Sequence, residues 1–145
     1  MTTVDFYFNA EDRLQVACRL AGKVLAQKKR LLIHAPQPEV AGRIDKMLWT
    51  WPAIGFVPHC AAHDALAPET PVLIGTAEEA PEGCELLLNL SDETPPQFER
   101  FERLLEVVTA EEEGRKAARK RYKFYRDRGY PIASHDLAGK AARGD

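Results

Sequence analysis

The sequence predicts a single α/β domain built on a parallel or mixed β-sheet. The prediction rests on short apolar runs that alternate with segments whose apolar residues recur at helical spacing. A chain of 145 residues fits one domain with one hydrophobic core. The sequence contains no internal repeat and no sign of a second domain.

The first quarter of the chain predicts a strand, a helix and a second strand. Residues 4–8 are rich in aromatic and β-branched side chains, which favour a strand. Asn9 is placed to cap a helix, with Asp12 three residues later as in a capping box, and the helical apolar spacing continues to Leu25. The compact apolar run 31–35 is typical of a buried strand.

The middle of the chain predicts a second helix followed by further strands. The helix begins near Pro38 and ends before Pro52, which disfavours helical geometry at the residue preceding it. Residues 56–59 read as an extended piece, and 61–71 as a surface loop rich in Ala, Pro, Asp and Glu. Two more strands are expected at 72–75 and 85–90.

The last third predicts a strand and a long helix. A short helical turn at 98–101 precedes an apolar strand at 104–108. Residues 109–112 resemble a second capping box, and the helix that follows runs to about Arg128, with Gly129 as its C-terminal cap. We expect one domain over residues 1–133 and a flexible C-terminal tail over residues 134–145.

Composition excludes several classes of protein. Hydrophobic residues make up 45% and charged residues 29% of the chain, which is ordinary for a soluble globular protein. A net charge of −2 argues against a molecule that binds nucleic acid over its whole surface. No apolar stretch approaches the roughly 20 residues that span a bilayer. The start of the chain does not resemble a signal peptide, and the three widely spaced cysteines read as reduced thiols, so we expect a cytoplasmic protein.

Basic residues are concentrated in the last predicted helix, where eight of the fourteen residues from 115 to 128 are Lys or Arg. On a helical wheel at about 100° per residue, Ala117 and Phe124 point to one side, which we expect to pack on the sheet. The opposite side carries a stripe of arginines with a tyrosine among them. The residues of this stripe are Arg115, Arg119, Tyr122 and Arg126, with Lys123 at its edge.

The chemistry of the stripe leaves three interpretations open. Arginine forks bind carboxylates in pairs of hydrogen bonds, and a tyrosine ring offers apolar area, so the stripe suits an acidic peptide with an aromatic or apolar end. It equally suits phosphate groups with a stacked base, which would make the chain a direct single-stranded nucleic-acid-binding protein. The third interpretation is a solvated basic face that complements the helix dipole and binds nothing.

Three sequence blocks resemble one known family. The string Arg121–Arg126 is followed by Gly129 and Tyr130, the string Ile44–Trp49 is followed by residues 56–59, and the chain opens with residues 4–7, Val-Asp-Phe-Tyr. Together these blocks, in this order and spacing, resemble the chi subunit of bacterial DNA polymerase III. The resemblance spans nearly the whole chain.

The resemblance implies a Rossmann-like, three-layer α/β fold with a mostly parallel central sheet and no nucleotide-binding loop. It also implies a non-catalytic accessory subunit of the clamp-loader assembly in DNA replication, which contacts DNA only indirectly. The implied partner is the C-terminal tail of single-stranded DNA-binding protein, an aspartate-rich stretch that ends in Pro-Phe. The implied tail-binding residues are Arg115, Arg119, Tyr122, Lys123, Arg126 and Trp49, and Arg115 stands where the family residue is a lysine.

In this reading one arginine clamps the terminal carboxylate of the tail, while Tyr122 and Trp49 hold its last ring. A second surface is implied for the psi subunit or an equivalent clamp-loader partner. Trp51 and Phe56 are the candidate exposed apolar residues for that surface, with core packing the other role for Phe56.

Other constellations give weaker signals. His59, His63 and Cys84 are possible metal ligands, but a fourth ligand at standard spacing is missing, so we expect no metal. No glycine-rich phosphate loop follows Phe8, and no nucleophile elbow is present, so we expect no cofactor. A small α/β enzyme with a site near His34 and Asp5 remains a third functional class, without a recognisable catalytic set.

Overall fold

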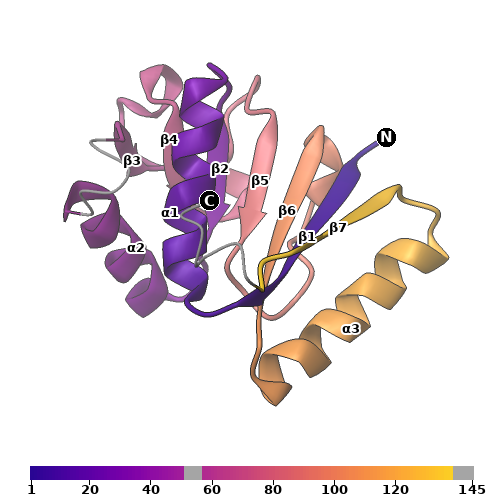
Figure 1. The fold of residues 1–145 in the computed structure, drawn as a ribbon. Coiled ribbons are helices and arrows are strands. Elements are labelled where there is room, and N and C mark those ends of the chain that lie inside the picture. The colour runs from indigo at the N-terminus through magenta and orange to yellow at the C-terminus, as the bar shows by residue number, and fades with distance from the viewer. Residues whose placement is uncertain (51–56, 139–145) are drawn as a thin grey trace.

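The computed structural model describes residues 1–50 and 57–138. Its described strands form one seven-stranded sheet in the order β3-β4-β2-β5-β6-β1-β7, and every neighbouring pair is parallel (Figure 1). The strands are β1 (Thr3–Ala10), β2 (Leu31–His34), β3 (His59–Ala61), β4 (Val72–Gly75), β5 (Leu86–Asn89), β6 (Arg103–Thr109) and β7 (Ile132–Asp136). The α-helices are α1 (Arg13–Ala26), α2 (Pro38–Thr50) and α3 (Glu112–Asp127), and the 3-10 helices are η1 (Ala67–Glu69), η2 (Ala77–Glu79) and η3 (Phe98–Arg100).

The sheet separates two hydrophobic layers. Leu31 and Ile33 of β2 lie in the layer covered by α1 and α2, whereas Leu32 between them lies in the layer that contains the buried residues of α3. This alternation is what a strand buried on both faces requires. The arrangement confirms the predicted Rossmann-like three-layer α/β fold with a parallel sheet.

The first helix is capped by Asp12 and not by Asn9. The Asp12 carboxylate accepts hydrogen bonds from the backbone amides of Leu14 (3.0 Å) and Gln15 (3.2 Å). Asn9 cannot serve as the cap because β1 continues through Ala10. Asn9 instead adopts a left-handed backbone (φ 64°), and its side chain donates to Asp136 at 2.9 Å. Asparagine tolerates this conformation better than most residues.

Replacing the true cap gives a testable result. Asp12→Ala should lower the free energy of unfolding by about 1 kcal/mol, since two amides of the first turn lose their acceptor. Urea denaturation measures this loss. Glu11→Ala is the matched control, because it removes an exposed carboxylate one residue earlier and should change stability by less than about 0.5 kcal/mol. Equal effects of the two substitutions would contradict the assignment.

The ends of α3 match the sequence prediction only at the C-terminus. Arg128 is the C-cap and Gly129 follows with φ 80°, as the glycine there predicted. At the N-terminus the expected capping box is not formed: Glu111 is the N-cap and its side chain makes no capping hydrogen bond. The Thr109 hydroxyl lies 3.4 Å from the Glu111 carboxylate instead.

Strand β7 was not predicted. Residues 4–8 of β1 pair in parallel with residues 132–136 of β7, so Ser134 to Asp136, which we had placed in the tail, belong to a strand. The segment is an edge strand with largely exposed residues, and it therefore lacks the apolar alternation that marks strands in a sequence. Residues 139–145 lie outside the described part of the chain.

Two further predictions involve residues 51–56, which lie outside the described part of the chain. Trp51 and Phe56 both fall in this range. Of the extended piece expected at 56–59, His59 begins strand β3. Within the described ranges, no helix combines the length and apolar character needed to cross a membrane.

Candidate functional site

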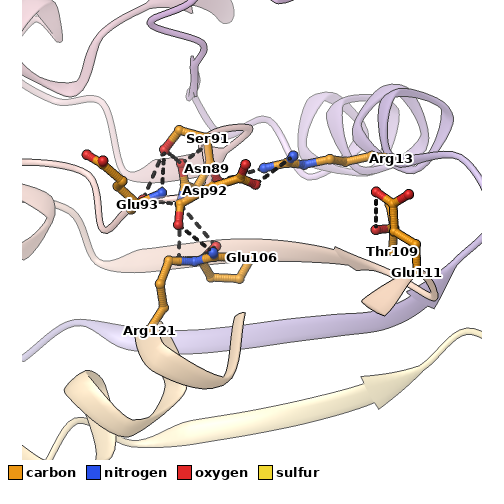
Figure 2. Close-up of polar contacts among 9 residues, drawn as sticks. All are labelled: Arg13, Asn89, Ser91, Asp92, Glu93, Glu106, Thr109, Glu111 and Arg121. Carbon is orange, nitrogen blue, oxygen red and sulfur yellow. Dashed lines mark hydrogen bonds and ion pairs between the residues drawn. The ribbon is translucent and has the colours of Figure 1, made fainter. Parts of the chain in front are cut away.

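A buried polar network fixes how α3 sits on the sheet. Glu106 of β6 is fully buried, and its carboxylate accepts hydrogen bonds from Arg121 Nε (3.1 Å) and the Tyr125 hydroxyl (2.7 Å). Asn89 of β5 donates to the same carboxylate at 3.1 Å. Arg121 also donates to the backbone carbonyl of Asp92 at 2.9 Å, so the guanidinium joins the helix to the loop after β5 (Figure 2).

The network corrects the predicted orientation of the helix. Its buried residues are Ala118, Arg121 and Tyr125, whereas Ala117 and Phe124, the expected inward residues, are only partly buried. A buried arginine is unusual and requires a charged or polar partner. Glu106 supplies it, which explains why a cationic residue occupies the inward face.

Burial also sets the protonation behaviour of this cluster. It raises the pKa of Glu106, while the charge of Arg121 and the hydrogen bonds from Tyr125, Asn89 and Arg121 oppose that rise. Burial, together with the neighbouring Glu106 charge, likewise raises the pKa of Tyr125. Tyr125 therefore stays protonated and donates its hydrogen bond at neutral pH.

With α3 held in this rotation, part of its basic stripe borders a groove. The groove has a volume of about 330 Å³ and lies between α3 and the strands β6, β1 and β7. Its floor is apolar, and the ring centroids of Phe6 and Tyr122 are 5.3 Å apart. Tyr122 is 37% exposed, so one part of its ring remains accessible. The lining residues are Phe6, Phe8, Asn9, Val108, Arg115, Ala118, Arg119, Tyr122 and Ser134.

The cations of the stripe occupy two positions relative to the groove. Arg115 and Arg119 line it, and Arg119 is held by an exposed ion pair with Glu112 at 3.1 Å. Lys123 and Arg126 are not lining residues; both face Asp127, at 2.8 Å and 3.6 Å. The hydrogen bond from Lys123, together with the positive charges of Lys123 and Arg126, lowers the pKa of Asp127. Exposed pairs of this kind are weak and exchange readily for other anions.

Trp49 does not lie opposite the stripe. It is on α2, is 60% exposed, and packs edge-on against the His59 ring with centroids 5.1 Å apart. Helix α2 covers the other face of the sheet from α3 and lies towards the β3 edge (Figure 1). The structure therefore brings Arg115, Arg119 and Tyr122 together and leaves Trp49 remote from them.

Sequence reasoning missed most of the groove floor. Phe6 and Phe8 are two residues apart on one strand, so their shared face was available from the period-two pattern of β1. Val108 and Ala118 required the pairing of α3 with β6 to be known. Ser134 gave no signal because its strand was not predicted.

His34 and Asp5, the residues considered for an enzyme site, have structural partners. His34 accepts a hydrogen bond from the Ala77 amide at 3.0 Å, and burial lowers its pKa. Asp5 is held by Arg103 (2.7 Å) and His135 (3.0 Å). It lies on β1, which β5 and β6 separate from the β2 strand that carries His34. In the described part of the chain, no group of three or more His, Cys, Asp and Glu side chains is arranged to hold a metal ion.

Comparison with known proteins identifies the family. The model of the family described as "DNA polymerase III chi subunit, HolC" matches residues 1–133. The chain belongs to the DNA polymerase III chi subunit family. Members of the chi family are subunits of the DNA polymerase III holoenzyme, which places this chain in DNA replication.

Three relatives of the chi family are similar over most of their length. A DNA polymerase III subunit chi of Pseudomonas aeruginosa is 38% identical over 141 residues, which covers 94% of this chain and 98% of the relative. The Escherichia coli protein of the same name is 31% identical over 132 residues, covering 90% and 88%. The Haemophilus influenzae protein is 28% identical over 140 residues, covering 93% and 97%.

Proposed function

We propose that this chi-family chain is a non-catalytic, cytoplasmic subunit that binds the acidic C-terminal tail of single-stranded DNA-binding protein and links it to the clamp-loader assembly. The observation that carries the proposal is the groove beside α3, which combines an apolar floor with Arg115 and Arg119 on one bank. These are the two properties that an acidic peptide ending in an aromatic residue needs.

The groove matches such a peptide in size and chemistry. Its volume of about 330 Å³ is at the small end of the roughly 300–1,000 Å³ typical of ligand pockets, which suits one aromatic side chain better than a larger ligand. Phe6, Phe8 and Tyr122 would surround that ring, and aromatic contacts favour tilted packing of this kind. One arginine would take the terminal carboxylate through paired hydrogen bonds.

The remaining cations act at longer range. Lys123 directly follows the groove-lining Tyr122, and Arg126 lies about one turn beyond it on the same helix. Both would attract the aspartates that precede the terminal ring. Their contribution is to the rate of association and is screened by salt. Raising salt from about 0.05 to 0.5 M should therefore weaken binding without abolishing it, since burial of the ring is not screened.

The tether also needs a second surface for the psi subunit or an equivalent clamp-loader partner. Trp49 is the exposed aromatic residue on α2, and its distance from the groove would let both partners bind together. We accordingly expect Trp49→Ala to leave the affinity for the tail peptide unchanged within about twofold, whereas Tyr122→Ala should weaken it at least tenfold. Fluorescence anisotropy with a labelled tail peptide measures both. Equal losses of peptide affinity in the two variants would show that Trp49 is part of the tail-binding site.

The same titration tests the proposal with a matched cation control. Arg119→Ala should weaken binding roughly ten- to hundredfold, as expected for a lost hydrogen bond to a charged group. Lys120→Ala removes an equal charge from the next residue, which is exposed and outside the groove, and should change affinity less than threefold. A peptide without its final Phe should not bind measurably.

The opposite pattern would support direct binding of single-stranded nucleic acid. In that case an oligonucleotide binds and the peptide does not, and Arg119→Ala and Lys120→Ala cause similar losses because each removes one phosphate contact. That result would overturn the proposed tether.

A further inference from the structure

Strand β7 forms one edge of the sheet and is paired only with β1 among the described strands. Two hydrogen bonds show which residues of β7 bond to β1. The Val4 amide donates to the Pro131 carbonyl, and the Leu137 amide donates to the Phe8 carbonyl, each at 2.9 Å. In a parallel pair, alternate residues of a strand bond to the same neighbour. The main-chain amides and carbonyls of residues 133 and 135 therefore face β1. Those of Ile132 and Ser134 point outward from the edge of the sheet.

This edge adjoins the groove. Ser134 lines the groove with its side chain, in register with Phe6 of β1, while its main chain forms the outer edge of β7. The bank opposite carries Arg115 and Arg119 on α3. A peptide whose last aromatic ring lies in the groove, and whose preceding residues pass over Ser134, would lie beside the outward-facing backbone groups of β7.

We propose that an extended acidic peptide adds to β7 as an eighth, edge-paired strand, with its terminal aromatic ring in the groove and its carboxylates facing Arg115 and Arg119. This inference rests on the proposed function and specifies how the peptide backbone is held. Strand addition supplies main-chain hydrogen bonds, while a pocket for one side chain supplies specificity.

Charge selects the peptide over a second copy of the chain as the occupant. Pairing β7 with β7 of another molecule would bring the arginines of two α3 helices towards one another, and like charges facing across an interface oppose association. A peptide rich in aspartate meets the same cations with favourable sign.

Backbone-modified peptides test the geometry directly. N-methyl groups are placed one at a time on the peptide amides that precede the terminal aromatic residue. Each methylated peptide is then titrated against the protein without substitutions. Strand addition predicts an alternating pattern, with losses of about tenfold where the amide faces β7 and little change at the intervening positions. Uniform tolerance of methylation, with the unmodified peptide still bound, would overturn strand addition and leave the proposed function intact. Failure of the unmodified peptide to bind would overturn both.

Amide exchange provides the readout on the protein side. Saturating peptide should slow hydrogen exchange at the Ile132 and Ser134 amides, and leave Ala133 and His135, which already bond to β1, comparatively unchanged. Ser134→Pro should weaken peptide binding about tenfold because it removes the outward donor, and proline is tolerated on an edge strand where the amide faces solvent. Ser134→Ala keeps that amide and should bind within twofold of the unmodified chain. Equal affinities of the two variants, or unchanged exchange at Ile132 and Ser134, would contradict the proposal.

Discussion

Arg121→Ala should lower the free energy of unfolding by about 3–5 kcal/mol, the loss typical of breaking one side of a buried ion pair. Arg121 is 5% exposed at its side chain and Glu106 is fully buried. Without the guanidinium, Tyr125 and Asn89 are the remaining hydrogen-bond donors to the Glu106 carboxylate among residues 1–50 and 57–138. Urea denaturation followed by circular dichroism measures the change.

Two comparisons separate the buried pair from helix charge in general. Arg119→Ala removes an exposed arginine from the same helix, and its pair with Glu112 is solvated, so stability should change by less than about 1 kcal/mol. The double variant Arg121→Met, Glu106→Leu removes both charges and should recover much of the stability lost in Arg121→Ala. A loss below 1 kcal/mol in Arg121→Ala would show that α3 is held by its apolar contacts alone.

Ser134→Phe should weaken binding of the tail peptide at least thirtyfold while the chain remains folded. The new ring would occupy the groove that Ser134 lines, and it would exclude an aromatic side chain whose burial contributes about 2–3 kcal/mol. Phenylalanine is also favoured in strands, so β7 should tolerate it. Peptide titration gives the affinity, and thermal unfolding checks the fold.

The adjacent residue provides the control for this substitution. Ala133 is exposed and, because side chains alternate along a strand, points to the opposite face of the sheet. Ala133→Phe adds the same apolar surface to the same strand and should leave peptide affinity within about twofold. Equal weakening by both variants would show that the peptide does not enter the groove.

The sequence predicted the fold in most of its elements, because central parallel strands are apolar throughout and amphipathic helices separate them. The apolar runs at 31–35, 72–75 and 85–90 became β2, β4 and β5. The helix caps predicted from local sequence were less accurate. The Asn9 and Thr109 capping boxes were wrong, since β1 runs on to Ala10 and Thr109 ends β6. A cap depends on where the preceding element ends, which local pattern does not specify.

The candidate site was predicted in part. The stripe was correctly located on α3, but the inward side of the helix was wrong. Ala117 and Phe124 were expected there, whereas the buried residues are Ala118, Arg121 and Tyr125. One signal was available: Glu106 interrupts the apolar run of a central strand, and a buried carboxylate requires a nearby cation. Trp49 could not be placed from sequence, because the order of strands decides which face a helix covers. The binding roles of the stripe residues remain predictions.

The buried pair between Arg121 and Glu106 bears on how the proposed tether would carry force. A subunit that joins two assemblies is pulled from both ends as they move. A helix attached only by surface contacts would peel from the sheet under such a pull. Here α3 is fastened through Glu106 to β6, which lies inside the sheet between β5 and β1. Tension applied at the proposed binding groove would therefore be shared along hydrogen-bonded strands.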